Sequence, residues 1–237
     1  MSQAQLSADL LDECRALALR LAPELAAAPL YVTDLPADYP DAGDTLAFAN
    51  RNGFDFAIRR HLLDQSRWAG PGTVIAFCQP MTDHEALGLL LHEAAHVVPF
   101  QAPPADFEPS EEFQAAQRLL VARKLIEPTG DVPTMPTWYA AHGLKFVRRC
   151  LHLHARAWSL GHEIGLPAIH FAGPEYDMAA PWRYRRTLGD EPQRMATATF
   201  SEIDSTPMPK AFRDLFHSDF QDWCDRTGKE PSHVHAA

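Results

Sequence analysis

The first helix is predicted near the start of the chain, where apolar residues recur every three or four positions. It covers residues 4–27 and is closed by Pro29. A helix with one apolar face packs that face against another element, so this segment is expected to join a folded core. The apolar face consists of Leu6, Leu10, Cys14, Leu17 and Leu21.

Strands are predicted where the helical spacing of apolar residues gives way to short runs of β-branched and aromatic residues. Residues 30–33 form a first short strand, and residues 73–78 form an apolar run after a Gly-Pro-Gly turn. Between them, residues 46–59 alternate weakly on both sides of Asn52-Gly53, a dipeptide that suits a tight turn. The pattern therefore predicts a small sheet that includes a hairpin over residues 46–59.

A second helix is predicted over residues 83–98, soon after the apolar run. Thr82 and Glu85 have the spacing of a capping box, in which each side chain accepts a hydrogen bond from a backbone N–H at the helix start. Pro99 supplies the end of the helix. The segment is strongly apolar, so we expect this helix to be buried.

The second half of the chain is mainly helical by the same criteria. Helices are expected over residues 111–126, 138–160 and 209–226. The proline-containing segment 165–209 is expected to be a loop. Residues from Lys229 onward are expected to be disordered.

The helix over residues 138–160 separates apolar from basic side chains. His152 falls on the basic side and is expected to be a surface histidine, whereas His154 falls on an apolar side and is expected to be a core histidine with a local hydrogen-bond partner. The basic side, expected to face water, holds Lys145, Arg148, Arg149, His152 and Arg156. Two apolar stripes, expected to be buried, hold Phe146, Cys150, Leu153 and Ala157, and Val147, Leu151 and Trp158.

The composition is that of an ordinary folded protein. The chain has 237 residues, of which 46% are apolar and 22% are charged, enough for one large domain or two small ones. Its net charge of −10 argues against general nucleic-acid binding, which usually needs a basic surplus. The first ten residues lack the pattern of a signal peptide, and no segment is apolar enough to span a membrane. The four cysteines, which include no CxxC pair, are Cys14, Cys78, Cys150 and Cys224. We therefore expect a cytoplasmic protein with free thiols and no membrane association.

The candidate chemistry lies in the helix over residues 83–98, which contains His92, Glu93 and His96 in an H-E-x-x-H pattern. Residues four apart lie on the same face of a helix, so both imidazoles can bind one metal ion. Glu93 would lie beside that ion and act as a base towards water. Burying these three polar side chains without such a partner would be costly. The pattern is typical of zinc-dependent hydrolases and predicts Zn²⁺ as the cofactor.

A catalytic zinc usually has three protein ligands and keeps a fourth position for water. The candidates for the third ligand are Glu111, Glu112, His142, His152 and His154. The two glutamates also fit as ordinary first-turn acids of a helix. We favour His142, because Gly143 beside it would let a metal-bearing helix approach closely. The residues alone leave the alternatives open.

The chain contains two motifs that together resemble those of SprT-like metallopeptidases and the related WLM group. These families pair H-E-x-x-H with a downstream H-G-x-x-F/W motif, which His142, Gly143 and Phe146 match. The resemblance implies that His142 is the third zinc ligand, beside His92 and His96. It covers two short motifs and the order of the elements.

The order of helix, small sheet and motif helix resembles the core of zincin metallopeptidases. The fold implied is α+β and zincin-like, with a small mixed sheet packed on the active-site helix and a mainly helical C-terminal part. Residues 1–228 would form a single metallopeptidase domain, made of 1–100 and 110–228, and residues 229–237 would form a disordered tail. In zincins an edge strand binds extended substrate by strand addition, and residues 46–59 are our candidate for that edge.

The resemblance implies a zinc metallopeptidase acting on a peptide or protein substrate, with Glu93 as the general base. Tyr139, Tyr176 and Tyr184 are candidates for stabilising the oxyanion. Two alternatives are an inactive zincin-fold protein that binds or scaffolds a partner, and a zinc hydrolase of a non-peptide amide. In a third, the motif is accidental in a structural domain, which would bind no stoichiometric metal.

Overall fold

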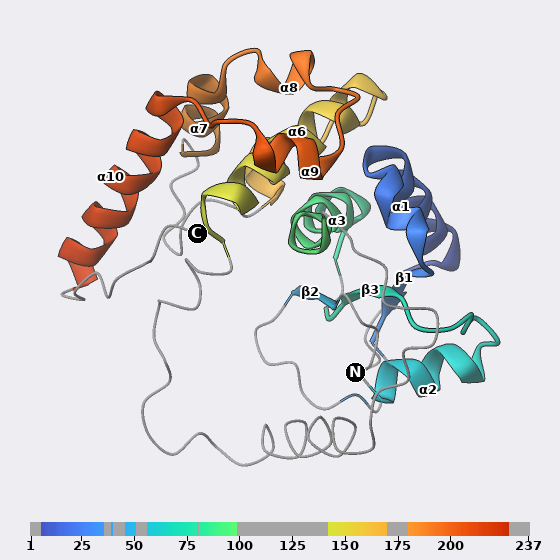
Figure 1. Ribbon diagram of the computed structural model, residues 1–237. Helices are drawn as coiled ribbons and strands as arrows, with labels where there is room; N and C mark the ends of the chain where they lie inside the picture. The colour runs from blue at the N-terminus through green and yellow to red at the C-terminus, as the bar shows by residue number, and fades with distance from the viewer. Residues whose placement is uncertain are drawn as a thin grey trace. The chain divides into compact units, whose positions relative to one another are not determined.

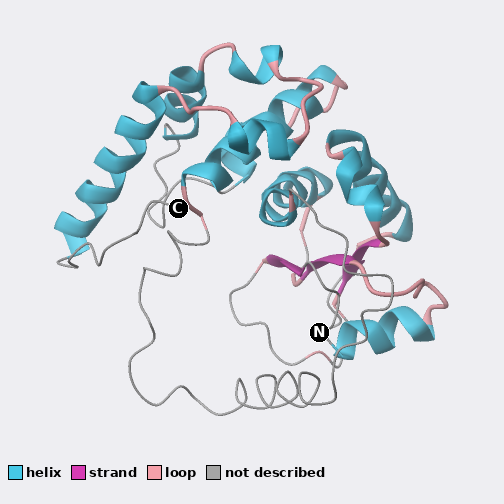
Figure 2. Cartoon of the chain, in the orientation of Figure 1, coloured by secondary structure: helices cyan, strands magenta, loops and turns pink. Residues whose placement is uncertain are grey.

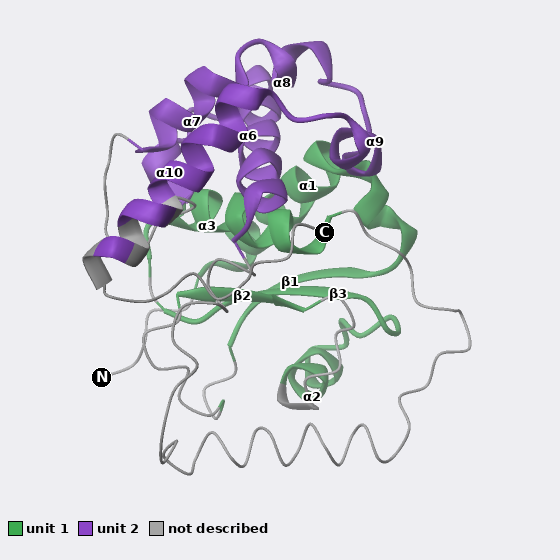
Figure 3. Ribbon diagram, turned by 60° about the vertical axis from the view of Figure 1, so that its left-hand side comes forward, with its two compact units in different colours: residues 1–131 green, residues 132–237 purple. Residues whose placement is uncertain are grey.

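The chain divides into two compact units, residues 1–131 and residues 132–237 (Figure 3). Within the described residues the protein is a mixed α+β structure with mainly helical content, as predicted (Figure 2). The single domain predicted over residues 1–228 stays a prediction, and the predicted tail lies outside the described residues. The computed structural model describes residues 6–35, 39, 46–50, 56–79, 81–98, 142–169 and 180–227.

The first unit contains a three-stranded sheet with the order β1-β3-β2 (Figure 1). β1 pairs with β3 in parallel, and β2 pairs with β3 antiparallel, so the sheet is mixed as predicted. The elements of this unit are α1 (Ala8–Leu21), the 3-10 helix η1 (Pro23–Ala27), β1 (Leu30–Asp34), β2 (Ala47–Asn50), α2 (Phe56–Asp64), β3 (Thr73–Phe77) and α3 (Asp83–Val97).

Helices cover both faces of this sheet (Figures 1 and 3). On one face, Ile58 and Leu62 of α2 pack against Tyr31, Val74 and Ala76 of the strands. α1 and α3 lie on the other face, where α3 contacts both β2 and β3. β3 is buried along its whole length, as expected of a central strand covered on both sides.

The turn before β3 fixes where this strand begins beside β1. The backbone N–H of Thr73 donates a hydrogen bond to the carbonyl oxygen of Pro29 at 2.9 Å. A Cβ at Gly72 would lie 2.0 Å from that same oxygen. Only glycine therefore permits this close approach, which holds the parallel pair in register.

The first helix is shorter than predicted. α1 ends at Leu21, and Ala22 has φ −138° and ψ 78°, outside the helical region. Pro23 explains the difference, because proline disfavours helical geometry in the residue before it. The chain continues as the 3-10 helix η1, with Pro23 in its first turn.

The hairpin predicted over residues 46–59 is wrong in its second arm. Residues 46–50 supply β2, but residues from Phe56 onward form α2. Ile58 and Leu62 are both fully buried and lie four residues apart, which matches a helix better than a strand. The turn predicted at Asn52-Gly53 lies outside the described residues.

The second unit consists of helices joined by loops, with no strand among its described residues (Figure 2). α10 packs against α7, and α6 packs against α8. The ring of Tyr184 lies edge-to-face against Phe212, with centroids 5.7 Å apart. The predicted helix over residues 111–126 lies outside the described residues. The elements of this unit are α6 (Leu144–Ser159), the 3-10 helix η2 (Leu166–Ile169), α7 (Ala180–Leu188), α8 (Glu191–Arg194), α9 (Phe200–Ser205) and α10 (Lys210–Thr227).

The segment 165–209, predicted as a loop, instead contains η2, α7, α8 and α9. Its prolines do not prevent these helices, because Pro181 and Pro192 lie in first turns, where no intrahelical N–H bond is lost. α9 has its own capping box, in which the N–H of Glu202 donates to the Thr199 hydroxyl at 3.2 Å. A high proline content is therefore compatible with helices in this segment, and the prediction of a loop is wrong.

The prediction that the basic side of α6 faces water holds for Lys145, which is exposed, but is wrong for three other residues of this side. Arg148 and His152 have no exposed surface, and Arg156 is 9% exposed. α8 and α9 cover this side and supply the groups that bind the basic side chains. The sequence pattern also predicts that Trp158 is buried, but this side chain is 57% exposed. The apolar stripe is confirmed as buried for Phe146, Cys150, Leu153 and Ala157.

Three of the cysteines carry free thiols as predicted, and the structure buries all three, namely Cys14, Cys78 and Cys150. The side chain of Cys224 lies outside the described part. Within the residues that the structure describes, none of the helices combines the length and the apolar character needed to cross a membrane.

Candidate metal centre

α3 positions the H-E-x-x-H motif, and its start is fixed by the predicted capping box. The Thr82 hydroxyl accepts from the N–H of Glu85 at 3.3 Å, and the Glu85 carboxylate accepts from the N–H of Thr82 at 2.8 Å. The motif then falls in the last turns of the helix, which ends at Val97. The sequence prediction for this element is confirmed.

His92 and His96 lie one turn apart on α3 and direct the same ring nitrogen at one another. Their Nε2 atoms are 3.3 Å apart, and their ring centroids are 5.0 Å apart. Both side chains are half-buried. The helix therefore brings two metal-binding nitrogens together without any rearrangement of its backbone.

The Nε2 separation suits a shared metal ion. Two nitrogens bound to one tetrahedral zinc at about 2.0–2.1 Å lie about 3.3 Å apart, and the observed separation is 3.3 Å. With the ring proton of each histidine on Nδ1, both Nε2 lone pairs are available to one cation. If one of the two rings carried its proton on Nε2, that nitrogen would instead donate a hydrogen bond to Nε2 of the other ring.

Glu93 lies between these histidines in sequence and is only 5% exposed. Burial raises the pKa of its carboxyl to about 8, because a carboxylate loses hydration in the protein interior. A cation beside it would favour the charged form and oppose this shift. A bound metal would thus favour the ionised form of this buried carboxyl, which lies on the same turns of α3 as the two histidines.

His142 lies in the turn that precedes α6, next to Gly143, the N-cap of that helix. Its ring stands edge-to-face on Phe146, with centroids 4.6 Å apart and an interplanar angle of 88°. One ring nitrogen from each of His92, His96 and His142 lies within 4.8 Å of the other two. The group could therefore hold a metal ion.

The other candidate ligands are either engaged elsewhere or not described. His154 is buried, and its Nε2 lies 2.9 Å from the carbonyl oxygen of Ile164, to which it donates a hydrogen bond. This confirms the predicted core histidine with a local partner. Burial lowers its pKa, although the bond to Ile164 opposes this. Glu111 and Glu112 lie outside the described residues.

Of the tyrosines considered for oxyanion stabilisation, Tyr184 is described. It is 4% exposed and packs against Phe212 and Phe216 of α10, as expected for a core residue. Tyr139 and Tyr176 lie outside the described residues.

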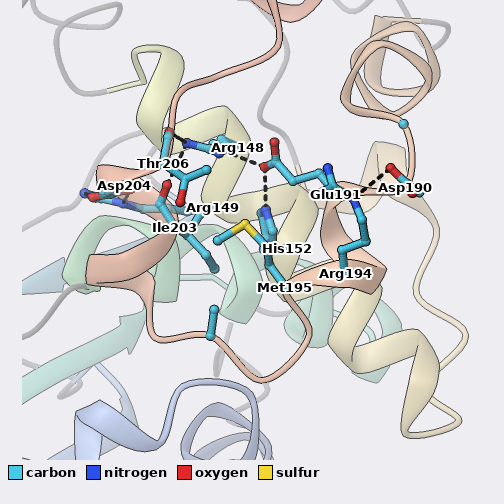
Figure 4. A network of polar contacts seen from close by, with 12 residues as sticks. Arg148, Arg149, His152, Asp190, Glu191, Arg194, Met195, Ile203, Asp204 and Thr206 are labelled. Carbon is cyan, nitrogen blue, oxygen red and sulfur yellow. Dashed lines mark hydrogen bonds and ion pairs between the residues drawn. The ribbon is translucent and has the colours of Figure 1, made fainter.

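The sequence pattern missed a buried polar network in the second unit (Figure 4). Arg148 donates from Nε to Glu191 at 2.7 Å, and from Nη1 to the carbonyl oxygens of Ile203 at 2.7 Å and Thr206 at 2.8 Å. His152 lies 2.9 Å from the same oxygen of Glu191 that Arg148 binds. Glu191 is 39 and 43 residues from its two partners, so no local pattern could have identified it.

The pKa values of Glu191 and His152 are both lowered within this network. Burial tends to raise the pKa of Glu191, but hydrogen bonds from His152 and Arg148 outweigh it and hold that pKa below its usual value. Burial lowers the pKa of His152, and the nearby Arg148 and Arg156 lower it further against the opposing effect of Glu191. His152 is thus neutral near pH 7 and donates its Nε2 proton to the carboxylate.

Comparisons with known proteins give no match. No family model, no curated protein and no solved structure matches the chain. The resemblance to SprT-like metallopeptidases therefore rests on the two short motifs, and membership of that family stays a prediction.

Proposed function

We propose that this protein is a zinc-dependent metallopeptidase of the zincin type, similar to the SprT-like group. His92, His96 and His142 would bind the zinc, and Glu93 would act as the general base. The observation that carries the proposal is the Nε2 separation of 3.3 Å between His92 and His96, which equals the spacing of two zinc ligands. The buried carboxyl of Glu93 on the same helix turn adds the base that hydrolysis needs.

Each residue has a distinct role in this proposal. Zinc, when bound, supplies a Lewis acid that lowers the pKa of water and polarises the scissile carbonyl. Glu93 takes the proton from the attacking water and later delivers it to the leaving amine. Its burial supports this role, because a desolvated carboxylate is a stronger base than an exposed one.

The arrangement of the sheet supports a peptide as the substrate. β2 is an outer strand of the described sheet, and it contacts α3, the helix that carries the motif. An extended peptide that added itself to β2 would be held by its backbone close to this helix, with little demand on its side chains. Residues 46–50 thus remain our candidate for the substrate-binding edge.

The test combines metal content with hydrolysis. Elemental mass spectrometry of the purified protein should find about one zinc per chain, retained in Glu93→Gln and lost in His92→Ala. Wild type should hydrolyse a broad substrate such as casein, and Glu93→Gln should lose at least about a hundredfold of that rate. Zinc without hydrolysis would favour the binding or scaffold alternative. A folded wild type without zinc would refute the metal site.

A further inference from the structure

Arg148 joins α6 to three other segments of the second unit. Its guanidinium binds Glu191 of α8, the last turns of α9 at Ile203, and Thr206 just after α9 (Figure 4). Arg148 has no exposed surface and Glu191 is 3% exposed. Water does not compete for these bonds, so they hold α6 more firmly than surface ion pairs would.

Glu191 also fixes the rotation of α6 about its own axis. One oxygen of this carboxylate accepts from Arg148 and from His152, which lie one turn apart on the same side of the helix. A single acceptor shared by two successive turns restricts both rotation and sliding of the helix. Neither motion can occur without leaving a buried charge unpaired.

His142 lies in the turn immediately before α6, so this restriction extends to the candidate metal centre. Phe146 is 4% exposed and braces the His142 ring at 4.6 Å, and Arg148 is only two residues further along the helix. A rotation of α6 would therefore carry Phe146 and the His142 ring with it.

We propose that Glu191, acting through Arg148 and His152, is a positioning residue that holds His142 in the orientation needed for metal binding. This inference rests on the proposed function, in which His142 is a zinc ligand. It assigns a role in the metal centre to a carboxylate that does not touch the metal.

The first test follows the His142 ring in metal-free protein. Its ring-proton resonances, assigned by comparison with His142→Ala, carry a shift from the ring current of Phe146. Glu191→Gln should move these resonances, because the amide cannot replace the charge that binds Arg148 and His152. Asp190→Asn is the matched control, since Asp190 is the neighbouring acid but has an exposed side chain that pairs with Arg194 on the surface. It should leave the resonances unchanged.

The second test measures zinc affinity by competition with a chelator. Glu191→Gln should weaken binding about tenfold, the lower end of what residues that orient a metal ligand contribute. The same substitution in a His142→Ala background should have no effect, because nothing remains to be positioned. Equal weakening in both backgrounds would overturn the inference, since it would indicate a general loss of structure.

A double variant separates positioning from stability. Arg148→Met with Glu191→Leu replaces the buried ion pair by apolar side chains, a change that proteins often tolerate without losing stability. It should fold, yet shift the His142 resonances and weaken zinc binding as Glu191→Gln does. Unchanged resonances and affinity in both variants would overturn the inference. Absence of zinc from wild type itself would instead refute the proposed function, and would remove this role of Glu191 with it.

Discussion

Arg148 shows how much a single buried side chain contributes when its charge is paired inside the protein. Arg148→Ala would leave the Glu191 carboxylate buried, 3% exposed, without the guanidinium that donates to it at 2.7 Å. We expect the free energy of unfolding to fall by about 3–5 kcal/mol, as for other broken buried pairs. Urea unfolding followed by circular dichroism would measure this loss.

Arg194→Ala provides the comparison for this prediction. Arg194 forms an ion pair with Asp190 in which both side chains are exposed, so solvent screens the interaction. Its removal should change the free energy of unfolding by less than about 1 kcal/mol. A loss of similar size in the two variants would contradict the structural distinction between them.

The pH dependence of stability tests the protonation of His152. Its pKa in the folded protein is lowered from the usual value of 6.5, so the unfolded chain takes up a proton first as pH falls. The stabilising effect is fully present above about pH 6.5 and declines as pH falls towards the folded-state pKa. His154 acts in the same direction. Glu191 adds a further loss below its usual pKa of 4.5.

Glu93 acts in the opposite direction, because its raised pKa of about 8 makes the folded protein take up a proton before the unfolded chain does. The test is therefore the difference between wild type and His152→Gln, measured by urea unfolding between pH 8 and pH 5 with a chelator present. His152→Gln should be less stable than wild type at pH 8, and the gap between the two should narrow towards acid. A slope identical to that of wild type would mean that His152 is not buried in its neutral form.

The residues of the metal centre were predictable to different degrees. His92, Glu93 and His96 follow from helical spacing, because four residues make about one turn. His142 depends on a motif match, since no local spacing relates it to α3. Glu191 could not be found, because it meets α6 only through the packing of α8 in the folded chain.

Among the elements, α3 has the most clearly defined start. Thr82→Ala would remove the hydroxyl that accepts from the N–H of Glu85. We expect the free energy of unfolding to fall by about 1 kcal/mol, because the N–H of Glu85 at the start of the helix loses its side-chain acceptor. Thr82→Ser keeps the hydroxyl and should be close to wild type. Thermal unfolding of the three proteins would measure the difference.

The elements found from sequence are those with an unambiguous period or a clear end signal. β1, β3, α3 and α10 all match their predicted positions within two residues. α2 was missed because weak alternation resembled a strand, and α7 to α9 were missed because prolines at helix starts were read as loop. The buried basic side of α6 was read as exposed, because its partners come from α8 and α9.

At the scale of the whole molecule, the chain forms two compact units, and the zinc site proposed above would take ligands from each. His92 and His96 belong to the first unit, whereas His142 precedes α6 in the second. A zinc ion bound by all three would link the stabilities of the units, since unfolding either one would release it. Zinc at a hundred times its dissociation constant should then stabilise the folded chain by about 2.7 kcal/mol.

Hydrogen exchange followed by mass spectrometry would localise this stabilisation. Zinc should slow exchange of backbone amides in α3 and in the first turns of α6 of wild type. In His142→Ala the effect should be confined to α3, because the two remaining ligands both lie on that helix. In His92→Ala it should vanish from both helices. Protection of α3 alone in wild type would remove His142 from the zinc site and restore Glu111 or Glu112 as the candidate third ligand.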